Sequence, residues 1–172
     1  MTEALELESR RKIYDLIKNY PGLHLSKIAA LLNMRLSLAE YHLFYLEKNK
    51  VIVSTKEAGY TRYYIKNKLG AEDKRILSIL RQDTPMKIVL LLLNHGHLKH
   101  KDLLQNLDIA PSTLSYHLKK LVKRNIIEVQ TYGDERGYTI INREKIIRLL
   151  VQFKPYNLVE SFKDIWMNLT VD

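Results

Sequence analysis

The chain has 172 residues, 46% of them hydrophobic, which is enough to form one or two small domains with real cores. It carries 28 basic and 19 acidic residues, a net charge of +9, which favours polyanionic partners such as nucleic acid or an anionic membrane surface. It has no cysteine, which excludes disulfides, thiol catalysis and cysteine-based zinc sites and suits a reducing cytosol.

Nothing in the sequence predicts a targeting or membrane segment. The N-terminal stretch "MTEALELESRRK" lacks the apolar region of a signal peptide. The longest apolar run, "IVLLLL" at residues 88–93, is far shorter than the ~20 residues that cross a bilayer. We therefore expect a soluble, cytoplasmic protein with no membrane partner.

The chain matches itself without a gap at an offset of 75 residues. Tyr41-His42-Leu43 corresponds to Tyr116-His117-Leu118, and the register holds from about 12–53 to 87–128. Two copies of one small domain are the simplest explanation.

In the first copy, helical periodicity predicts a first helix at residues 10–20 and a short second helix around residues 28–32. Ser37 and Glu40 have the spacing of a capping box, which predicts a third helix from Ser37 to about residue 49. The β-rich segments "VIVST" and "TRYYIK" follow, and the glycine between them predicts a hairpin.

The second copy repeats this order, with helices expected at 85–94, 101–107 and 112–124 and strands at "IIEVQTY" and "GYTIIN". Thr84 is expected to cap the first of these helices. Asn125 follows the third helix, where asparagine tolerates the left-handed conformation that ends helices.

Two segments lie outside the repeat. Residues 71–82 predict a linker helix, and residues 143–169 predict one or two C-terminal helices. One apolar stripe lies on the last helix and has two open interpretations, a homodimer surface or packing within the chain. Its residues are Leu158, Phe162, Ile165, Trp166 and Leu169.

The predicted fold class is mainly α with small β-hairpins (α+β). The pattern S-x-x-x-x-H-L-x-x-L occurs from Ser112 and again from Ser37, on the third helix of each copy. This pattern resembles the winged helix-turn-helix regulators of the ArsR and MarR families, and the tandem arrangement resembles archaeal tandem winged-helix regulators. The resemblance implies winged helix-turn-helix domains at 1–67 and 84–142, a linker helix at 68–83 and C-terminal helices at 143–172.

The resemblance implies that double-stranded DNA is the partner and that the third helix enters the major groove. Short hydroxyls and an aromatic ring precede a run of lysines on the third helix of the second copy, and each wing offers an arginine. The expected DNA-binding residues in the second copy are Ser112, Thr113, Ser115, Tyr116, Lys119, Lys120, Lys123 and Arg136. Those in the first copy are Ser37, Tyr41, Tyr45 and Arg62.

The two third helices differ in charge. Residues 112–125 hold four basic and no acidic side chains, whereas residues 37–50 hold two of each. Because phosphate binding scales with the cations delivered, we expect both copies to touch DNA and the second to dominate. Phe44 and Tyr45 in the first copy fit extra core or a protein interface equally well.

Other functions are less well supported. His95, His97 and His100 could bind a metal, but they lie in a turn between helices, so we expect no metal site and no cofactor. No catalytic triad, phosphate loop or carboxylate pair indicates an enzyme. A transcriptional regulator that represses by covering a promoter is the leading hypothesis, and the alternative is a winged-helix protein-interaction module of transcription or chromosome-organising machinery.

Overall fold

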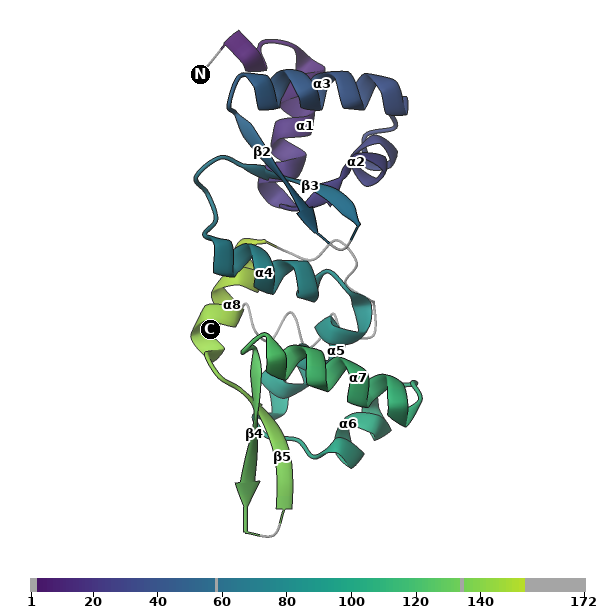
Figure 1. Ribbon diagram of the computed structural model, residues 1–172, viewed down its shortest axis with the longest axis vertical. Helices are drawn as coiled ribbons and strands as arrows, with labels where there is room; N and C mark the ends of the chain where they lie inside the picture. The colour runs from purple at the N-terminus through teal and green to yellow at the C-terminus, as the bar shows by residue number, and fades with distance from the viewer. Residues whose placement is uncertain (1–2, 58, 134, 154–172) are drawn as a thin grey trace. The chain divides into compact units, whose positions relative to one another are not determined.

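The computed structural model describes residues 3–57, 59–133 and 135–153 (Figure 1). Within these residues, eight α-helices accompany two small antiparallel sheets, which confirms the predicted α+β class. The chain divides into two compact units between Lys74 and Arg75, inside the segment that we expected to be a linker. No described helix is long and apolar enough to cross a membrane.

Unit 1 consists of three helices and a three-stranded sheet. Its elements are η1 (Glu3–Leu5), α1 (Glu8–Asn19), β1 (Leu23–His24), α2 (Leu25–Leu31), α3 (Leu36–Lys48), β2 (Ile52–Glu57) and β3 (Tyr60–Ile65). The strands pair antiparallel in the order β1-β3-β2. Ile13 and Ile17 of α1 pack with Leu43 and Leu46 of α3 in the core, so the apolar stripes of these helices face each other.

Unit 2 repeats this plan and adds a helix at each end. Its elements are α4 (Ala71–Leu80, which spans the division), α5 (Asp83–His95), α6 (His100–Asn106), α7 (Pro111–Lys123), β4 (Ile127–Tyr132), β5 (Glu135–Ile140) and α8 (Arg143–Gln152). β4 and β5 form an antiparallel hairpin, and Leu98 pairs with Tyr138 beside it. Leu114, Leu118 and Leu121 of α7 are buried in this unit.

Four elements of unit 1 recur in unit 2 with bounds displaced by 75 residues: α2 as α6, α3 as α7, β2 as β4 and β3 as β5. The pairing of Leu23 with Tyr63 likewise recurs as Leu98 with Tyr138. We call two residues equivalent when their numbers differ by 75. This register allows the two units to be compared residue by residue.

Helices α3 and α7 end in the same way. The residue after each C-cap is left-handed, with φ of 58° at Lys50 and 53° at Asn125, as predicted for the asparagine. Val51 N–H bonds to Leu46 O at 3.0 Å, and Ile126 N–H bonds to Leu121 O at 3.1 Å. These six-to-one bonds define a Schellman motif, which turns the chain sharply from the helix into the wing.

Two helix starts differ from the prediction. Arg35 caps α3 without a side-chain hydrogen bond, so Ser37 lies inside the first turn and is not the cap. The backbone accounts for this, because Arg35 O already accepts from the N–H groups of Leu38 and Ala39. Similarly, α5 begins at Asp83, one residue before the expected cap Thr84.

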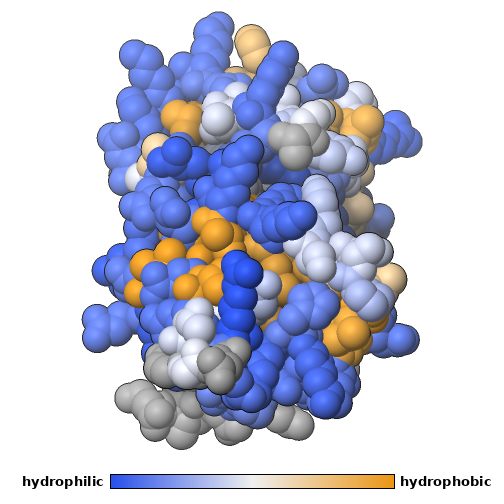
Figure 2. All heavy atoms as spheres, turned by 60° about the horizontal axis from the view of Figure 1, so that its bottom comes forward, coloured by the Kyte–Doolittle hydropathy of each residue, from blue (hydrophilic) through white to orange (hydrophobic). Residues whose placement is uncertain are grey.

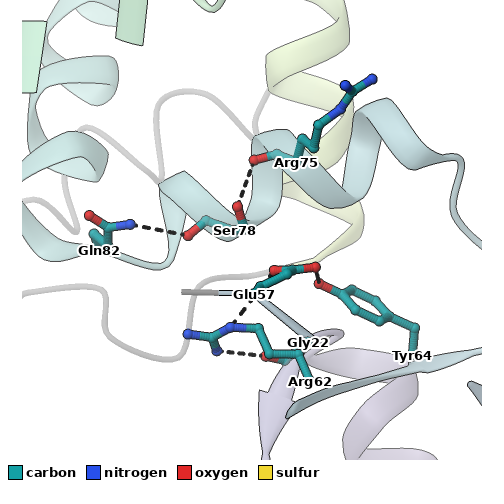
Figure 3. A network of polar contacts seen from close by, with 7 residues as sticks. All are labelled: Gly22, Glu57, Arg62, Tyr64, Arg75, Ser78 and Gln82. Carbon is teal, nitrogen blue, oxygen red and sulfur yellow. Dashed lines mark hydrogen bonds and ion pairs between the residues drawn. The ribbon is translucent and has the colours of Figure 1, made fainter. Parts of the chain in front are cut away.

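Beside the sheet of each unit, a large side chain contacts a glycine, but the two residues exchange positions between the units. In unit 1, Arg62 of β3 donates from Nη1 to Gly22 O at 2.9 Å (Figure 3). In unit 2 the equivalent of Arg62 is Gly137, and the equivalent of Gly22 is His97. A Cβ on Gly137 would lie 2.1 Å from His97 Nε2, so the imidazole occupies the space above this glycine. A large side chain therefore meets a glycine in both units, with the roles exchanged.

Candidate nucleic-acid interface

Helix α7 has one buried face and one free face. Leu114, Leu118 and Leu121 are buried, as the apolar spacing predicted. The predicted DNA contacts Ser112, Thr113, Tyr116, Lys119 and Lys123 are exposed, and Tyr116 retains 61% of its accessible surface. The hydroxyls lie in the first turn of α7 and the lysines in its second half, the order in which a recognition helix meets bases and then phosphates.

Two predicted contacts on α7 are instead engaged within the unit. Ser115 Oγ lies 3.1 Å from His100 Nε2 and thereby joins α7 to α6. Lys120 Nζ donates to Gln82 Oε1 at 2.9 Å, which ties α7 to the start of α5. These two residues hold α7 in place, and the free cations of this helix are the neighbouring exposed lysines.

A groove separates α7 from the wing formed by β4 and β5. Its volume is about 490 Å³, and it is lined by His100, Ser115, Leu118, Lys119, Val122, Val129, Arg136 and Tyr138. Figure 2 shows hydrophobic residues gathered in the middle of a mostly hydrophilic face. Arg136, predicted as the wing contact, is exposed and lies opposite Thr131 in the hairpin.

The equivalent helix of unit 1 exposes more apolar side chains and fewer cations. Leu36, Leu38, Tyr41 and Phe44 of α3 all lie on the surface, and Phe44 retains 66% of its accessible surface. Ser37 is exposed as well. Tyr41 and Ser37 are therefore accessible, as a DNA contact requires, but of the two exposed lysines of α7 only Lys123 has a lysine as its equivalent, Lys48.

Two predicted contacts of unit 1 are committed to its own packing. The guanidinium of Arg10, on α1, stacks 3.5 Å from the centre of the Tyr45 ring. Arg62 is mostly buried, with 16% of its side chain exposed, and besides Gly22 it faces Glu57 Oε2 at 3.7 Å (Figure 3). Glu57 also accepts from Tyr64 Oη at 2.6 Å. Both side chains are thus engaged inside the unit, and the DNA contacts expected of Arg62 in the wing and of Tyr45 on the helix stay predictions.

Two carboxylates act on Tyr63, a tyrosine of the wing in unit 1. Glu47 Oε1 accepts from Ser54 Oγ at 2.6 Å and from Ser54 N at 3.1 Å, which closes α3 onto β2. Burial raises the pKa of Tyr63, and the charges of Glu47 and Glu40 raise it further. Sequence reasoning missed this feature. The offset of 75 could have indicated it, because Glu47 and Ser54 are polar where the equivalent residues of unit 2, Val122 and Val129, are apolar.

The histidines of the turn before α6 do not converge on a metal. His95 contacts Asn94, His97 lies over Gly137, and His100 contacts Ser115. Within the described ranges, no group of three potential ligands is placed to hold a metal ion. The turn instead connects α5, the wing and α7.

His42 and His117 occupy equivalent positions in α3 and α7. Each imidazole meets the ring of the tyrosine before it edge-on, with centroids 5.4 Å and 5.1 Å apart. Burial lowers the pKa of both groups, with a further contribution from Arg10 for His42 and from Lys120 for His117. Both are therefore held neutral beside the core, which fits the structural role expected from their repetition.

The comparisons with known proteins agree with this geometry. Residues 82–129 match the family described as bacterial regulatory protein, arsR family. This part of the chain is similar to the DNA-binding domains of that family. The matched stretch covers α5, α6 and α7 and extends into β4. The matched family consists of regulatory proteins, which agrees with the resemblance to regulators of this class that the sequence predicted.

Similar proteins include regulators from an archaeon and a bacterium. An HTH-type transcriptional regulator of Methanocaldococcus jannaschii, MJ1398, is 29% identical over 133 residues. The match covers 77% of this chain and 33% of that protein, so the chain spans about a third of the length of this relative. The transcriptional repressor PagR of Bacillus anthracis is 32% identical over 46% of this chain and 92% of its own, with a TM-score of 0.41. The endosomal complex ESCRT-II matches 79% of this chain and 61% of its own at 14% identity, with a TM-score of 0.32.

The apolar stripe from Leu158 to Leu169, expected as a homodimer surface, lies outside the described residues.

Proposed function

We propose that this chain is a DNA-binding transcriptional regulator in which unit 2 supplies most of the contacts to duplex DNA. One observation carries the proposal. The free face of α7 and the adjoining wing present Lys119, Lys123 and Arg136, and the lining of the groove between them contains no carboxylate. A surface of this kind attracts phosphates, and binding to it should weaken steeply as salt rises.

The proposed contacts divide by type. Ser112, Thr113 and Tyr116, in the first half of α7, approach base edges in the major groove. Lys119 and Lys123 bind phosphates, and Arg136 reaches the backbone or the minor groove beside the wing. Ser115 and Lys120 hold α7 at the angle that this docking needs, through His100 and Gln82.

Unit 1 has the same order of helices and strands, so we propose that the two units are tandem winged-helix domains and that unit 1 makes the weaker DNA contact. Promoter occlusion is the proposed mechanism, and the similarity to PagR, a transcriptional repressor, supports repression. A regulator that acts on DNA works where the DNA lies, which we propose is the cytoplasm.

The deciding experiment measures affinity for a mixed-sequence duplex by fluorescence anisotropy at several salt concentrations. Lys119→Glu/Lys123→Glu reverses two exposed charges on α7, and Phe44→Glu/Lys48→Glu alters the equivalent positions on α3. We expect the α7 variant to bind DNA about 100-fold more weakly. The slope of log affinity against log salt concentration should become shallower by about 0.9 for each of about two lost phosphate contacts. The α3 variant should lose less than about tenfold, and equal losses in both would contradict the proposed dominance of unit 2.

A homodimer through the C-terminal stripe remains a proposal of the same kind. Removing residues 155–172 should halve the molar mass in light scattering if the stripe joins two chains. An unchanged mass would assign it to packing within the chain.

A second candidate function concerns unit 1, which fits a winged-helix protein-interaction module. The exposed Leu36, Tyr41 and Phe44 favour it, because aromatic and aliphatic side chains are typical of the centre of protein interfaces. A chain that acts only as such a module would bind duplex DNA more weakly than a Kd of about 10⁻⁴ M at physiological salt, the weak limit of nonspecific binding. The anisotropy measurement on the wild-type chain therefore separates the two functions.

A further inference from the structure

The groove beside α7 has an apolar floor and a cationic rim. Leu118, Val122 and Val129 supply the floor, and Lys119 and Arg136 supply the charges. Tyr138, Ser115 and His100 add groups that can form hydrogen bonds. The volume of about 490 Å³ lies within the range of small-molecule sites, which are mostly apolar with a few placed polar groups.

The equivalent positions in unit 1 have the opposite chemistry. Val122 and Val129 correspond to Glu47 and Ser54, whose two hydrogen bonds close α3 onto β2. Lys119 corresponds to Phe44, and Arg136 corresponds to Thr61, so neither cation is present. The fold therefore does not require an open, positively charged groove at this place. The groove is a property of the side chains of unit 2.

We propose that this groove binds a small amphipathic anion, with a carboxylate or sulfonate on an apolar body, and that this anion competes with DNA. Arg136 pairs with the acid group, because a guanidinium binds a planar carboxylate through two parallel hydrogen bonds. Lys119 adds a second positive charge at the rim. The apolar body covers Val122 and Val129, which are half-buried in the free chain.

Competition follows from the shared cations and rests on the proposed function. Lys119 and Arg136 are the groups that we assign to DNA phosphates. An anion held between them removes two positive charges from the face that approaches DNA. The ligand would thus release the chain from DNA without any change of fold.

The test uses 1-anilinonaphthalene-8-sulfonate, an amphipathic anion whose fluorescence rises in apolar sites, and octanoate as a non-fluorescent competitor. Binding is measured on the full chain without DNA, and the DNA complex is then titrated with octanoate. Arg136→Gln removes the charge that pairs with the acid. Val122→Glu/Val129→Ser transplants the pair that closes the groove in unit 1. Lys56→Gln, on the exposed wing strand β2, is the control for loss of one positive charge.

We expect one saturable site for the probe, displacement by octanoate, at least about tenfold weaker binding in Arg136→Gln and no binding in Val122→Glu/Val129→Ser. Lys56→Gln should bind as the wild type does, and octanoate should dissociate the DNA complex. Equal probe binding by the wild type and both groove variants would overturn the proposal, as would an octanoate-saturated chain that binds DNA unchanged. Circular dichroism verifies the fold of the valine variant, and if it fails to fold, the comparison of Arg136→Gln with Lys56→Gln decides. A wild type that binds the probe but no DNA at all would contradict the proposed function and leave the anion site standing.

Discussion

Units 1 and 2 share their helices, strands and pairing register, yet they present different chemistry at the third helix. In unit 2, α7 and the wing surround a groove with valines on its floor and cations at its rim. In unit 1, Glu47 and Ser54 close the equivalent place, and Glu40 and Glu47 act on Tyr63. Unit 1 thus combines an acidic wing junction with the exposed apolar side chains of α3.

The difference shows that the fold and the binding surface are specified by separate residues. The buried leucines, such as Leu43 and Leu118, are the same in both units and determine how the third helix packs. Some exposed positions beside them diverge, such as Phe44 and Lys119, and these determine what each helix can touch. Comparing variants at equivalent positions therefore separates stability from recognition.

The largest effect is expected for Leu43→Ala and Leu118→Ala, which truncate equivalent leucines that are each 1% exposed. Each should lower the free energy of unfolding of its own unit by about 2–5 kcal/mol, because a buried cavity is left behind. Hydrogen exchange of the amides in each unit measures this loss. Only Leu118→Ala should also weaken DNA binding strongly, and a similar weakening by Leu43→Ala would break the comparison.

A smaller effect is expected from pH. His42 and His117 have lowered pKa values in the folded chain, so the unfolded chain takes up protons first as pH falls through the ordinary value of 6.5. Their contribution to stability is present above pH 6.5 and is lost as pH falls through the folded pKa values. Thermal unfolding between pH 7.5 and pH 5 should show a falling melting temperature. Replacing both histidines with glutamine should make that dependence shallower, whereas an unchanged profile would contradict a role for them.

The smallest effect concerns the left-handed residues that end α3 and α7. Lys50→Gly should stabilise unit 1 by about 1 kcal/mol, because a side chain at positive φ is strained and glycine is not. Asn125→Gly should gain less, since asparagine tolerates this conformation better. Thermal melts of the two variants compare these gains, and a larger gain at Asn125 would reverse the expected order.

Features that depend on local spacing could be predicted from the sequence. The apolar stripe of α7, the two hairpins and the left-handed Asn125 each follow from residues close together in the chain. The positions of Arg62 and Lys120 could not be predicted, because their partners Gly22 and Gln82 lie about 40 residues away and are brought near only by folding. The cap expected at Ser37 failed for a different reason, because backbone geometry at Arg35 started the helix earlier without any side-chain cap.

The exchanged contact beside the sheets has a consequence for how the two units can mutate. Arg62 lies against Gly22 in one unit, and His97 lies over Gly137 in the other. A side chain at position 137 collides with His97, and a glycine at position 97 alone leaves a space that nothing fills. A side chain at position 137 therefore requires a smaller residue at position 97, so these two positions of unit 2 should change as a pair. The residue that is allowed at position 137 thus depends on the residue present at position 97.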